Sequence, residues 1–590
     1  MTSAFLGVER SLSGRRWIGP DAALSRQTDA LTQATGLPAA VCHLLARAGI
    51  PAPAAEAYLA PTLRDLMPDP LTLCDMDRAV ACLLHRLDRG DAIAIFADYD
   101  VDGGASAALL LDWLGQLGHQ ATLYVPDRID EGYGPNVPAM EALARQHALI
   151  ICVDCGTLAL EPIAAARRLG ADVLVLDHHL GAEALPEANA VVNPNRQDET
   201  TPLGYLSAAG VVFMTLVAAN AARRAAGLSA PPLLPLLDLV ALATVADVAP
   251  LLGLNRAFVR QGLTVMARRA RPGLAALADV AGLRSPPTAY HLGFLLGPRV
   301  NAGGRIGRAD LGARLLAETD PERAAAMAAE LDRLNTARRG VEAEVLAAAE
   351  AQIAARDAEA PLVWAAGEGW HPGVVGIVAA RLKERLNRPA IVIGIEGAEG
   401  KGSGRSVAGV DLGSAVAAAA REGVLLKGGG HRMAAGLTVA RTGIEPAMAR
   451  LSALLARQGA GAAGPADLTI AGLLSAGAAT PDLIAEIERA GPFGAGASAP
   501  RHALAAQRIT FAKRAGDSHL RLRLSDATGA LDAIAFRAFD GPLGPRLEAH
   551  AGEAWHIAGR LEIDDWGGRR RAKLRVEDAA PAGGHANPVA

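Results

Sequence analysis

Three carboxylates at alternate positions follow an apolar run early in the chain. Residues 92–97 are apolar, and Asp98, Asp100 and Asp102 come next, with Gly103 directly behind them. In a β-strand, residues i, i+2 and i+4 point to the same side, so this spacing predicts three negative charges crowded at one strand end. Such a cluster needs a cation, and hard divalent cations take oxygen ligands. A simple turn is the alternative, because Asp and Gly are ordinary turn residues.

Acidic and imidazole side chains recur after later apolar runs, each of which is predicted to be a strand. In parallel sheets, ligands gather at the carboxyl ends of the strands, so we expect these side chains to meet at one edge. A mixed set of Asp and His suits Mn²⁺ or Mg²⁺, whereas Cys-rich sets favour zinc. The residues are Asp154 after 149–153, the triplet Asp177-His178-His179 after 172–176, and Asp247 after 239–246.

The elements that must position these residues alternate between strand and helix over residues 78–260. Strands that alternate with helices over short connections predict a mostly parallel sheet with helices on both faces. The fold class is therefore α/β. The predicted strands are 92–97, 121–125, 149–153 and 172–176, and the predicted helices are 77–87, 105–117, 139–146 and 160–169.

The length and composition of the chain limit the kinds of protein it can be. A chain of 590 residues predicts about three or four domains. It is 51% hydrophobic and 20% charged, which is typical of a globular protein. The net charge of −4 gives no overall attraction to nucleic acid, so a basic site must be local.

Neither a membrane span nor a secretory signal is predicted, because no apolar run reaches about 18 residues and no apolar core precedes a cleavage site at the N-terminus. The five cysteines are odd in number and sparse, which favours a reducing, cytoplasmic location. Cys152 and Cys155 form a CxxC pair, which we interpret as core packing rather than a redox or zinc site.

Glycine-rich segments with cations occur further along the chain. Glycine lets backbone approach a ligand closely, and arginine binds phosphate with two hydrogen bonds. Residues 296–308 are interpreted as a Gly/Arg-rich loop, although such a loop is as often a solvated turn. Residues 427–436 are predicted to form an anion-binding amide nest before a helix, with a flexible linker as the alternative. A third such segment is 402–406.

These motifs resemble those of the DHH phosphoesterase superfamily, which is named after the Asp-His-His triplet. Asp100, Asp102 and Ser106 fit its DxDxxxS form. One departure is Gly104-Ala105-Ser106, where the family usually has Ala-Thr-Ser; we expect the extra glycine to loosen the turn. The segments Gly-Ser-Gly-Arg-Ser at 402–406 and Gly-Gly-Gly-His-Arg-Met-Ala-Ala-Gly at 428–436 resemble motifs of the DHH-associated domain.

Pattern and resemblance together predict a parallel-sheet DHH domain and a smaller α/β DHH-associated domain joined by a long helix, with a C-terminal OB-like β-barrel. The predicted divisions are an N-terminal helical lead-in (1–77), the DHH domain (78–315), the connector helix (316–358), the DHH-associated domain (359–457), an OB-fold nucleic-acid-binding domain (466–578) and a disordered tail (579–590).

The resemblance is strongest to the single-strand-specific exonucleases of the superfamily. It implies 5′→3′ hydrolysis of phosphodiester bonds in single-stranded DNA with two ions of Mn²⁺ or Mg²⁺, in DNA recombination and repair. The implied metal ligands are Asp98, Asp100, Asp102, Asp154, His178 and Asp247, and all of them except Asp98, together with His179, are the implied catalytic residues. The implied substrate-binding residues are Ser106, Asn301, Arg305, Ser403, Arg405, Gly430 and His431. The 5′→3′ direction rests on the resemblance alone.

A helicase and a single-strand-binding protein are the implied partners of a monomeric enzyme. Two alternatives belong to other function classes. A nano-RNase or phosphoadenosine phosphatase of the DHH type is much shorter and lacks the C-terminal barrel. A non-catalytic DNA-binding replication scaffold is expected to have lost metal ligands, and none is missing here.

Overall fold

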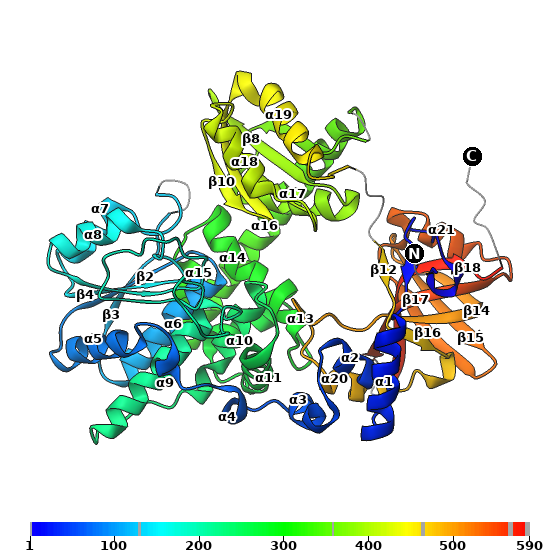
Figure 1. The fold of residues 1–590 in the computed structure, drawn as a ribbon, viewed down its shortest axis with the longest axis horizontal. Helices are drawn as coiled ribbons and strands as arrows, with labels where there is room; N and C mark the ends of the chain where they lie inside the picture. The colour runs from blue at the N-terminus through cyan, green and yellow to red at the C-terminus, as the bar shows by residue number, and fades with distance from the viewer. Residues whose placement is uncertain (1–2, 128–130, 357–358, 462–466, 565–569, 584–590) are drawn as a thin grey trace.

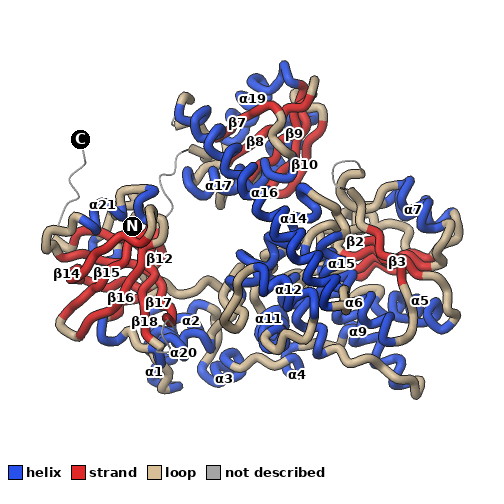
Figure 2. The backbone as a smooth tube through the Cα atoms, turned by 180° about the vertical axis from the view of Figure 1, so that it is seen from behind, coloured by secondary structure: helices blue, strands red, loops and turns tan. Residues whose placement is uncertain are grey.

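The computed structural model describes residues 3–127, 131–356, 359–461, 467–564 and 570–583. A large α/β domain and a C-terminal barrel lie at opposite ends of the molecule, and a smaller α/β domain lies above them at the far end of helix α16 (Pro321–Ala354) (Figures 1 and 2). In those ranges, no helix combines the length and the apolar character that a membrane crossing needs.

The first α/β domain contains a five-stranded, wholly parallel sheet in the order β3-β2-β4-β5-β6. Its elements are β2 (Ile93–Ala97), β3 (Ala121–Tyr124), β4 (Leu149–Val153), β5 (Asp172–Leu176), β6 (Ala190–Val192), α5 (Met76–Asp88), α6 (Val101–Gln116), α7 (Val137–Ala144), α8 (Leu160–Arg168) and α9 (Ala208–Ala225). Alternate residues of β2 serve two cores. Ile93 and Ile95 pack with α5, α6 and α9, whereas Ala94 and Phe96 pack with α7 and α8. The predicted parallel sheet with helices on both faces is confirmed.

A helical half completes this domain. Its elements are α10 (Leu237–Ala246), α11 (Gly253–Met266), α12 (Pro272–Val280), α13 (Ala289–His291), the π-helical turn η5 (Leu292–Leu296), α14 (Gly297–Ile306) and α15 (Leu311–Ala317). Two predictions are wrong here. Residues 239–246 form a helix rather than a strand, since an apolar run of this length fits either element. Residues 297–306 form α14 rather than a loop.

Helix α16 joins the two α/β domains. Asp320 caps it by accepting a hydrogen bond from Arg323 N, and its 34 residues span about 50 Å. Leu331 and Leu334 pack into the core of the first domain, whereas Val345 packs into that of the second. One helix therefore supplies side chains to both cores, as a connector must.

The second α/β domain has a mixed sheet in the order β10-β11-β9-β8-β7, in which only β7 and β8 pair in parallel. Its elements are β7 (Val363–Glu368), α17 (Pro372–Leu386), β8 (Ala390–Glu396), β9 (Glu399–Arg405), α18 (Leu412–Arg421), β10 (Lys427–His431), β11 (Ala434–Ala440) and α19 (Ile444–Ala456). The predicted amide nest before a helix is wrong, because residues 427–436 form the β10–β11 hairpin. Most of the segment 402–406 likewise lies in strand β9.

The C-terminal domain is a barrel that closes where β14 pairs with both β15 and β17. Its elements are β12 (Leu468–Thr469), β13 (Gly472–Leu474), α20 (Pro481–Arg489), β14 (His502–Ala515), β15 (His519–Asp526), β16 (Gly529–Ala535), α21 (Leu543–Glu548), β17 (Ala554–Asp564) and β18 (Arg571–Pro581). The predicted barrel is confirmed, but the tail is not disordered from residue 579. Ala579 and Ala580 are buried in β18, where they pair with β17. Residues 584–590 of the predicted tail lie outside the described residues.

The N-terminal segment packs on the far end of the chain. Strand β1 (Trp17–Ile18) pairs in parallel with β12, and Trp17 Nε1 donates a hydrogen bond to Asp578 Oδ2 at 3.0 Å. Helices α1 (Ala22–Thr35) and α2 (Ala39–Arg47) share a small core with α20, and α3 (Ala55–Leu59) and α4 (Leu63–Leu66) lead on to the first domain.

Candidate metal centre

The first acidic segment is a turn from strand into helix. Strand β2 ends at Ala97, and α6 starts at Val101 with Asp100 as its cap. Asp100 Oδ1 accepts hydrogen bonds from the backbone N–H groups of Asp102 (2.8 Å) and Gly103 (3.1 Å). The predicted strand-like alternation is therefore wrong, and the carboxylates converge because the chain folds back at a helix N-terminus. A side chain at Gly103 would meet the carbonyl of Asp98.

Gly104 does not loosen this turn. It lies inside α6, and a Cβ there would stand 3.3 Å from Ala313 Cα of α15. The glycine thus lets α15 pack closely on α6. The expectation of a looser turn is wrong.

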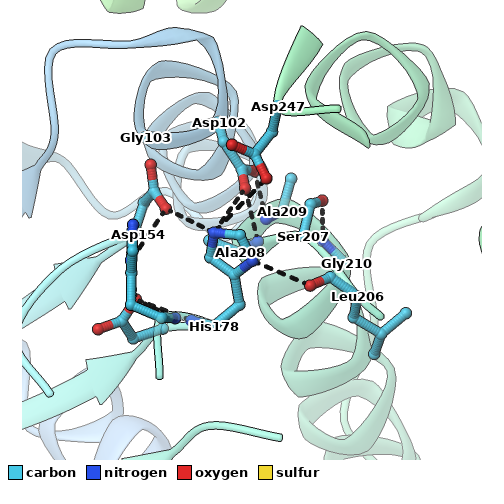
Figure 3. A network of polar contacts seen from close by, with 12 residues as sticks. Asp102, Gly103, Asp154, His178, Leu206, Ser207, Ala208, Ala209, Gly210 and Asp247 are labelled. Atoms are coloured by element: carbon cyan, nitrogen blue, oxygen red, sulfur yellow. Dashed lines mark hydrogen bonds and ion pairs between the residues drawn. The ribbon is translucent and has the colours of Figure 1, made fainter. Parts of the chain in front are cut away.

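Asp102 is held by a second helix. Its side chain is fully buried, and its two oxygens accept hydrogen bonds from Ala208 N (2.7 Å) and Ala209 N (2.8 Å), the first residues of α9 (Figure 3). Burial raises the pKa of Asp102, and its partly exposed neighbour Asp100 adds to the rise. The N-terminal amides of α9 offset part of this cost.

Asp154 follows β4 with a left-handed backbone, φ +59°. This conformation is uncommon outside glycine, although Asp tolerates it better than most residues. The side chain is buried, and Oδ1 makes no hydrogen bond within the described protein. Burial and the surrounding carboxylates, Asp100 first among them, raise the pKa of Asp154 well above its usual range. A buried carboxylate oxygen without a donor calls for a bound cation or a proton.

His178 faces three of these carboxylates. Its Nδ1 lies 3.1 Å from the carbonyl oxygen of Leu206, which can only accept, so Nδ1 carries the proton. The other ring nitrogen, Nε2, lies 3.3 Å from Asp154 Oδ1, 3.6 Å from Asp247 Oδ2 and 3.7 Å from Asp102 Oδ2 (Figure 3). It makes no hydrogen bond with any of them. A backbone carbonyl that fixes the outer nitrogen is typical of a metal-binding histidine.

Asp177, the first residue of the triplet, holds the two histidines in place. Its buried Oδ1 accepts hydrogen bonds from the backbone N–H of His178 and from His179 Nδ1 at 2.8 Å, and Oδ2 accepts one from Thr157 N. Burial opposes ionisation, but these bonds outweigh it and hold the pKa of Asp177 below its usual value. Burial lowers the pKa of His179, yet Asp177 more than reverses this and raises it to about 9.

Asp247 caps the C-terminal end of α10, so its expected place at a strand end is wrong, but it still reaches the centre. Burial, followed by the charges of Asp102 and Asp100, raises its pKa to about 8. A helix end brings it from the opposite side to the strand ends that carry Asp154 and His178 (Figure 3).

The ligand atoms form three overlapping groups, within each of which they lie no more than 4.8 Å apart. Donors from three strand ends and one helix end therefore share a volume suited to divalent ions. Mixed carboxylate and imidazole donors fit Mn²⁺ or Mg²⁺, and the oxygen and nitrogen atoms without hydrogen bonds support that fit. The groups are Asp98, Asp100 and Asp154; Asp102, His178 and Asp247; and Asp154, His178 and His179.

Three of the predicted substrate-binding residues lie in the first domain, and each has a different environment. Asn301 accepts a hydrogen bond from Val101 N at 3.0 Å, so it holds the acidic turn in place. Arg305 bridges the two α/β domains through Gly373 O at 3.1 Å. Ser106 is fully buried in α6, and its role as a substrate contact stays a prediction.

In the second domain, Arg405 Nη1 donates to Ser403 Oγ at 3.0 Å. Gly376 of α17 lies directly against this pair, where a Cβ would stand 2.9 Å from Ser403 Oγ. Gly430 (φ +150°) and the exposed His431 belong to β10, which lies at the side of its domain nearest α14 (Figures 1 and 2).

Several functional groups carry no signal in the sequence pattern. The carbonyl of Leu206 and the amides of Ala208 and Ala209 act through backbone. Tyr133 places its hydroxyl 3.2 Å from His179 Nε2; its position in Gly132-Tyr133-Gly134, between two predicted elements, was the available hint. Cys152 and Cys155 are free and buried among apolar side chains, so their interpretation as core residues is confirmed.

The fold and this site define the DHH class of metal-dependent phosphoesterases. Family models match three segments: "DHH family, N-terminal domain" at residues 92–244, "DHHA1 domain" at 359–457 and "RecJ OB domain" at 470–578. The order and placement of these matches agree with the two α/β domains and the barrel.

Relatives that match over most of their length identify the family within this class. The single-stranded-DNA-specific exonuclease RecJ of Dickeya dadantii is 36% identical over 92% of this chain and 96% of its own length. The Escherichia coli protein of the same name is 33% identical over 86% and 91%. The crystal structure of Thermus thermophilus RecJ in complex with Mn²⁺ superposes with a TM-score of 0.79 at 29% identity, covering 97% of this chain and 80% of that one. A further structure of the same Thermus protein contains Mg²⁺. The chain belongs to the RecJ family.

Proposed function

We propose that this protein is a metal-dependent exonuclease that hydrolyses single-stranded DNA from the 5′ end, in DNA recombination and repair. The observation that carries the proposal is His178 Nε2, which faces three carboxylates without a hydrogen bond to any. The relatives named as single-stranded-DNA-specific exonucleases supply the substrate class.

Two ions of Mn²⁺ or Mg²⁺ would be held by Asp98, Asp100, Asp102, Asp154, His178 and Asp247. Asp154 and His178 each belong to two of the three ligand groups, so the groups overlap in one centre that could hold both ions. When bound, the two ions lower the pKa of the attacking water and neutralise the charge that develops on the phosphoryl oxygens.

The chain's own residues position the substrate. His179 Nδ1 lies 2.8 Å from Asp177 Oδ1, and this contact would orient the ring toward a phosphate oxygen of the substrate. Arg405 and Ser403 of the second domain would hold a terminal phosphate. Arg305 of α14 and Gly430 and His431 of β10 would also contact the substrate. The exposed strand β10 offers backbone without side chains at its glycines, which allows close approach of a phosphate.

The barrel would bind the longer part of the strand. Phe511 and Phe536 are each 46% exposed, the Arg575 guanidinium lies 5.6 Å from the Phe536 ring, and the His519 ring lies 5.2 Å from it. Exposed rings next to cations are typical of surfaces that stack single-stranded bases.

The two other function classes fit less well. A nano-RNase or phosphoadenosine phosphatase has no use for the segment matched as a RecJ OB domain at 470–578. A replication scaffold without activity does not need the complete donor set. We further propose a monomer that works with a helicase and a single-strand-binding protein in the cytoplasm; the five cysteines, all free, support that compartment.

The test compares 5′-labelled and 3′-labelled single strands with Mn²⁺ or Mg²⁺. The expected result is immediate release of the 5′ label as mononucleotide, late release of the 3′ label, and no digestion of the matching duplex. His178→Gln should remove the activity. Preferential cleavage of dinucleotides or phosphoadenosine, or binding of single strands without any cleavage, would instead support one of the other two classes.

A further inference from the structure

Two aromatic rings stand exposed on the first domain, outside the metal centre. Tyr290 is 52% exposed and Phe294 is 70% exposed, and among the described residues no large apolar side chain is more exposed than Phe294. Their ring centroids lie 5.1 Å apart with an interplanar angle of 25°, so they stack on each other. A stacked pair left in water is unusual, because the same rings would gain stability by burial.

The rings begin a continuous helical segment, residues 289–306, that leads to the metal centre. The N–H of Thr288 donates to His291 Nδ1 at 3.0 Å at its start. The π-helical turn η5 follows, and such turns are frequent at functional sites. Asn301, which holds the acidic turn through Val101 N, lies seven residues beyond Phe294, or about 10 Å along the axis. Figure 1 shows α13 on the side of the domain that faces the barrel.

Close packing also ties this segment to Asp247. A Cβ at Gly293 would stand 3.4 Å from Val245 Cγ1, and one at Gly297 would stand 3.1 Å from Ala246 Cβ. Val245 and Ala246 form the end of α10, directly before Asp247. The two glycines therefore let the π turn lie against the helix end that carries a candidate metal ligand.

A third exposed apolar side chain stands at the same helix end. Val248 is 69% exposed and has φ +60°, a strained conformation for a β-branched residue. Its N–H donates to the carbonyl of Val245, the residue against which Gly293 packs. Exposed apolar side chains therefore stand both on the ring-bearing segment and at the helix end that carries Asp247.

We propose that Tyr290 and Phe294 form a stacking platform for the bases of a single strand between the barrel and the metal centre. This inference rests on the proposed function and adds a residue-level basis for its preference for single strands. Phosphates would be drawn to cationic side chains such as Arg305 and Arg405, so the neighbouring nucleotides need a neutral surface for their bases. Stacking on a ring requires an unpaired base face, which a duplex hides within its own stack.

The test measures affinity for a 5′-phosphorylated single strand by fluorescence anisotropy in EDTA, where cleavage stops. Phe294→Ala and Tyr290→Ala should each weaken binding about 10-fold, as expected for loss of one base–ring stack. Phe294→Leu should behave like Phe294→Ala, because leucine keeps apolar area but has no π face, whereas Phe294→Tyr should retain wild-type affinity. Leu234→Ala removes another exposed side chain, 63% exposed, from the same domain and should change nothing.

A strand with single abasic sites locates the contact. At one or two positions the wild type should lose affinity for the abasic strand, and Phe294→Ala should show no further loss there. In Mn²⁺, KM should rise by a similar factor while kcat stays unchanged. If Phe294→Leu binds like wild type, or the abasic and protein changes are additive everywhere, the platform is refuted and the rings serve some other contact, such as a protein partner. If the wild type itself neither binds nor digests single strands, it is the proposed function that fails.

Discussion

Replacement of Asp154 by asparagine separates metal binding from folding. Asp154 Oδ1 is buried without a hydrogen bond and lies within 4.8 Å of ligand atoms of Asp98 and Asp100. Without metal, the charge of Asp154 is costly, because burial and the repulsion from its neighbours both raise the pKa of this carboxyl. Asp154→Asn keeps the shape and removes the charge.

The magnitude follows from the geometry. Two unit charges 4.8 Å apart repel by about 3.5 kcal/mol at an effective dielectric constant of about 20. The asparagine amide gains only part of this, because it is still buried without a hydrogen-bond partner for one atom, so we expect a net gain of about 2 kcal/mol for metal-free Asp154→Asn. For a domain of this size, that gain corresponds to a rise in Tm of about 4–8 °C. Saturating Mn²⁺ at about 1,000 times Kd should stabilise the wild type by about 4 kcal/mol, and the variant much less.

The assay is differential scanning calorimetry in EDTA and in a Mn²⁺ series, together with calorimetric titration of Mn²⁺. The matched control is Asp279→Asn, an exposed carboxylate of the same domain paired with Arg269, which should move neither curve. The reasoning is refuted if Asp154→Asn is less stable than wild type in EDTA and binds Mn²⁺ with unchanged affinity and stoichiometry.

Two further predictions concern the barrel. Trp17→Phe removes the donor to buried Asp578 and should cost about 1–3 kcal/mol in urea unfolding; the loss should shrink in an Asp578→Ala background, and equal losses in both would contradict the pairing. Burial, with His43 nearby, lowers the pKa of His502 to about 4, so below pH 6.5 the unfolded chain binds a proton that the folded chain does not. Stability should therefore fall by about 2 kcal/mol between pH 7 and pH 5, and His502→Leu should flatten this dependence.

The sequence predicted the donor set better than the elements that carry it. Asp154 and His178 follow strands as predicted, because short apolar runs rich in β-branched residues between two helices favour a buried strand. Asp100 and Asp102 lie in a helical turn, because the cap formed by Asp100 Oδ1 competes with strand geometry. The run before Asp247 is apolar throughout, which removes the periodicity that separates helix from strand.

Other features had no readable signal. The glycines of residues 428–430 pair with β11. A run of glycines has no side-chain alternation, so its sequence alone does not indicate a strand. The amides that hold Asp102 and the carbonyl that orients His178 belong to backbone, which every residue has. Ala579 and Ala580 were expected to be disordered from composition, but β17 supplies the hydrogen bonds that fix them.

The contact between Trp17 and Asp578 can form only near the end of synthesis. The two residues are 561 positions apart, and at about 5–20 residues per second a ribosome needs roughly 30 to 110 s to make the second after the first. The first α/β domain and the connector emerge well within that interval, so they can be folded while β1 still has no strand to pair with. Strand β1 can pair with β12 as soon as residues 468–469 are made, whereas the hydrogen bond that fixes Trp17 forms only when the last strand of the barrel, β18, is complete.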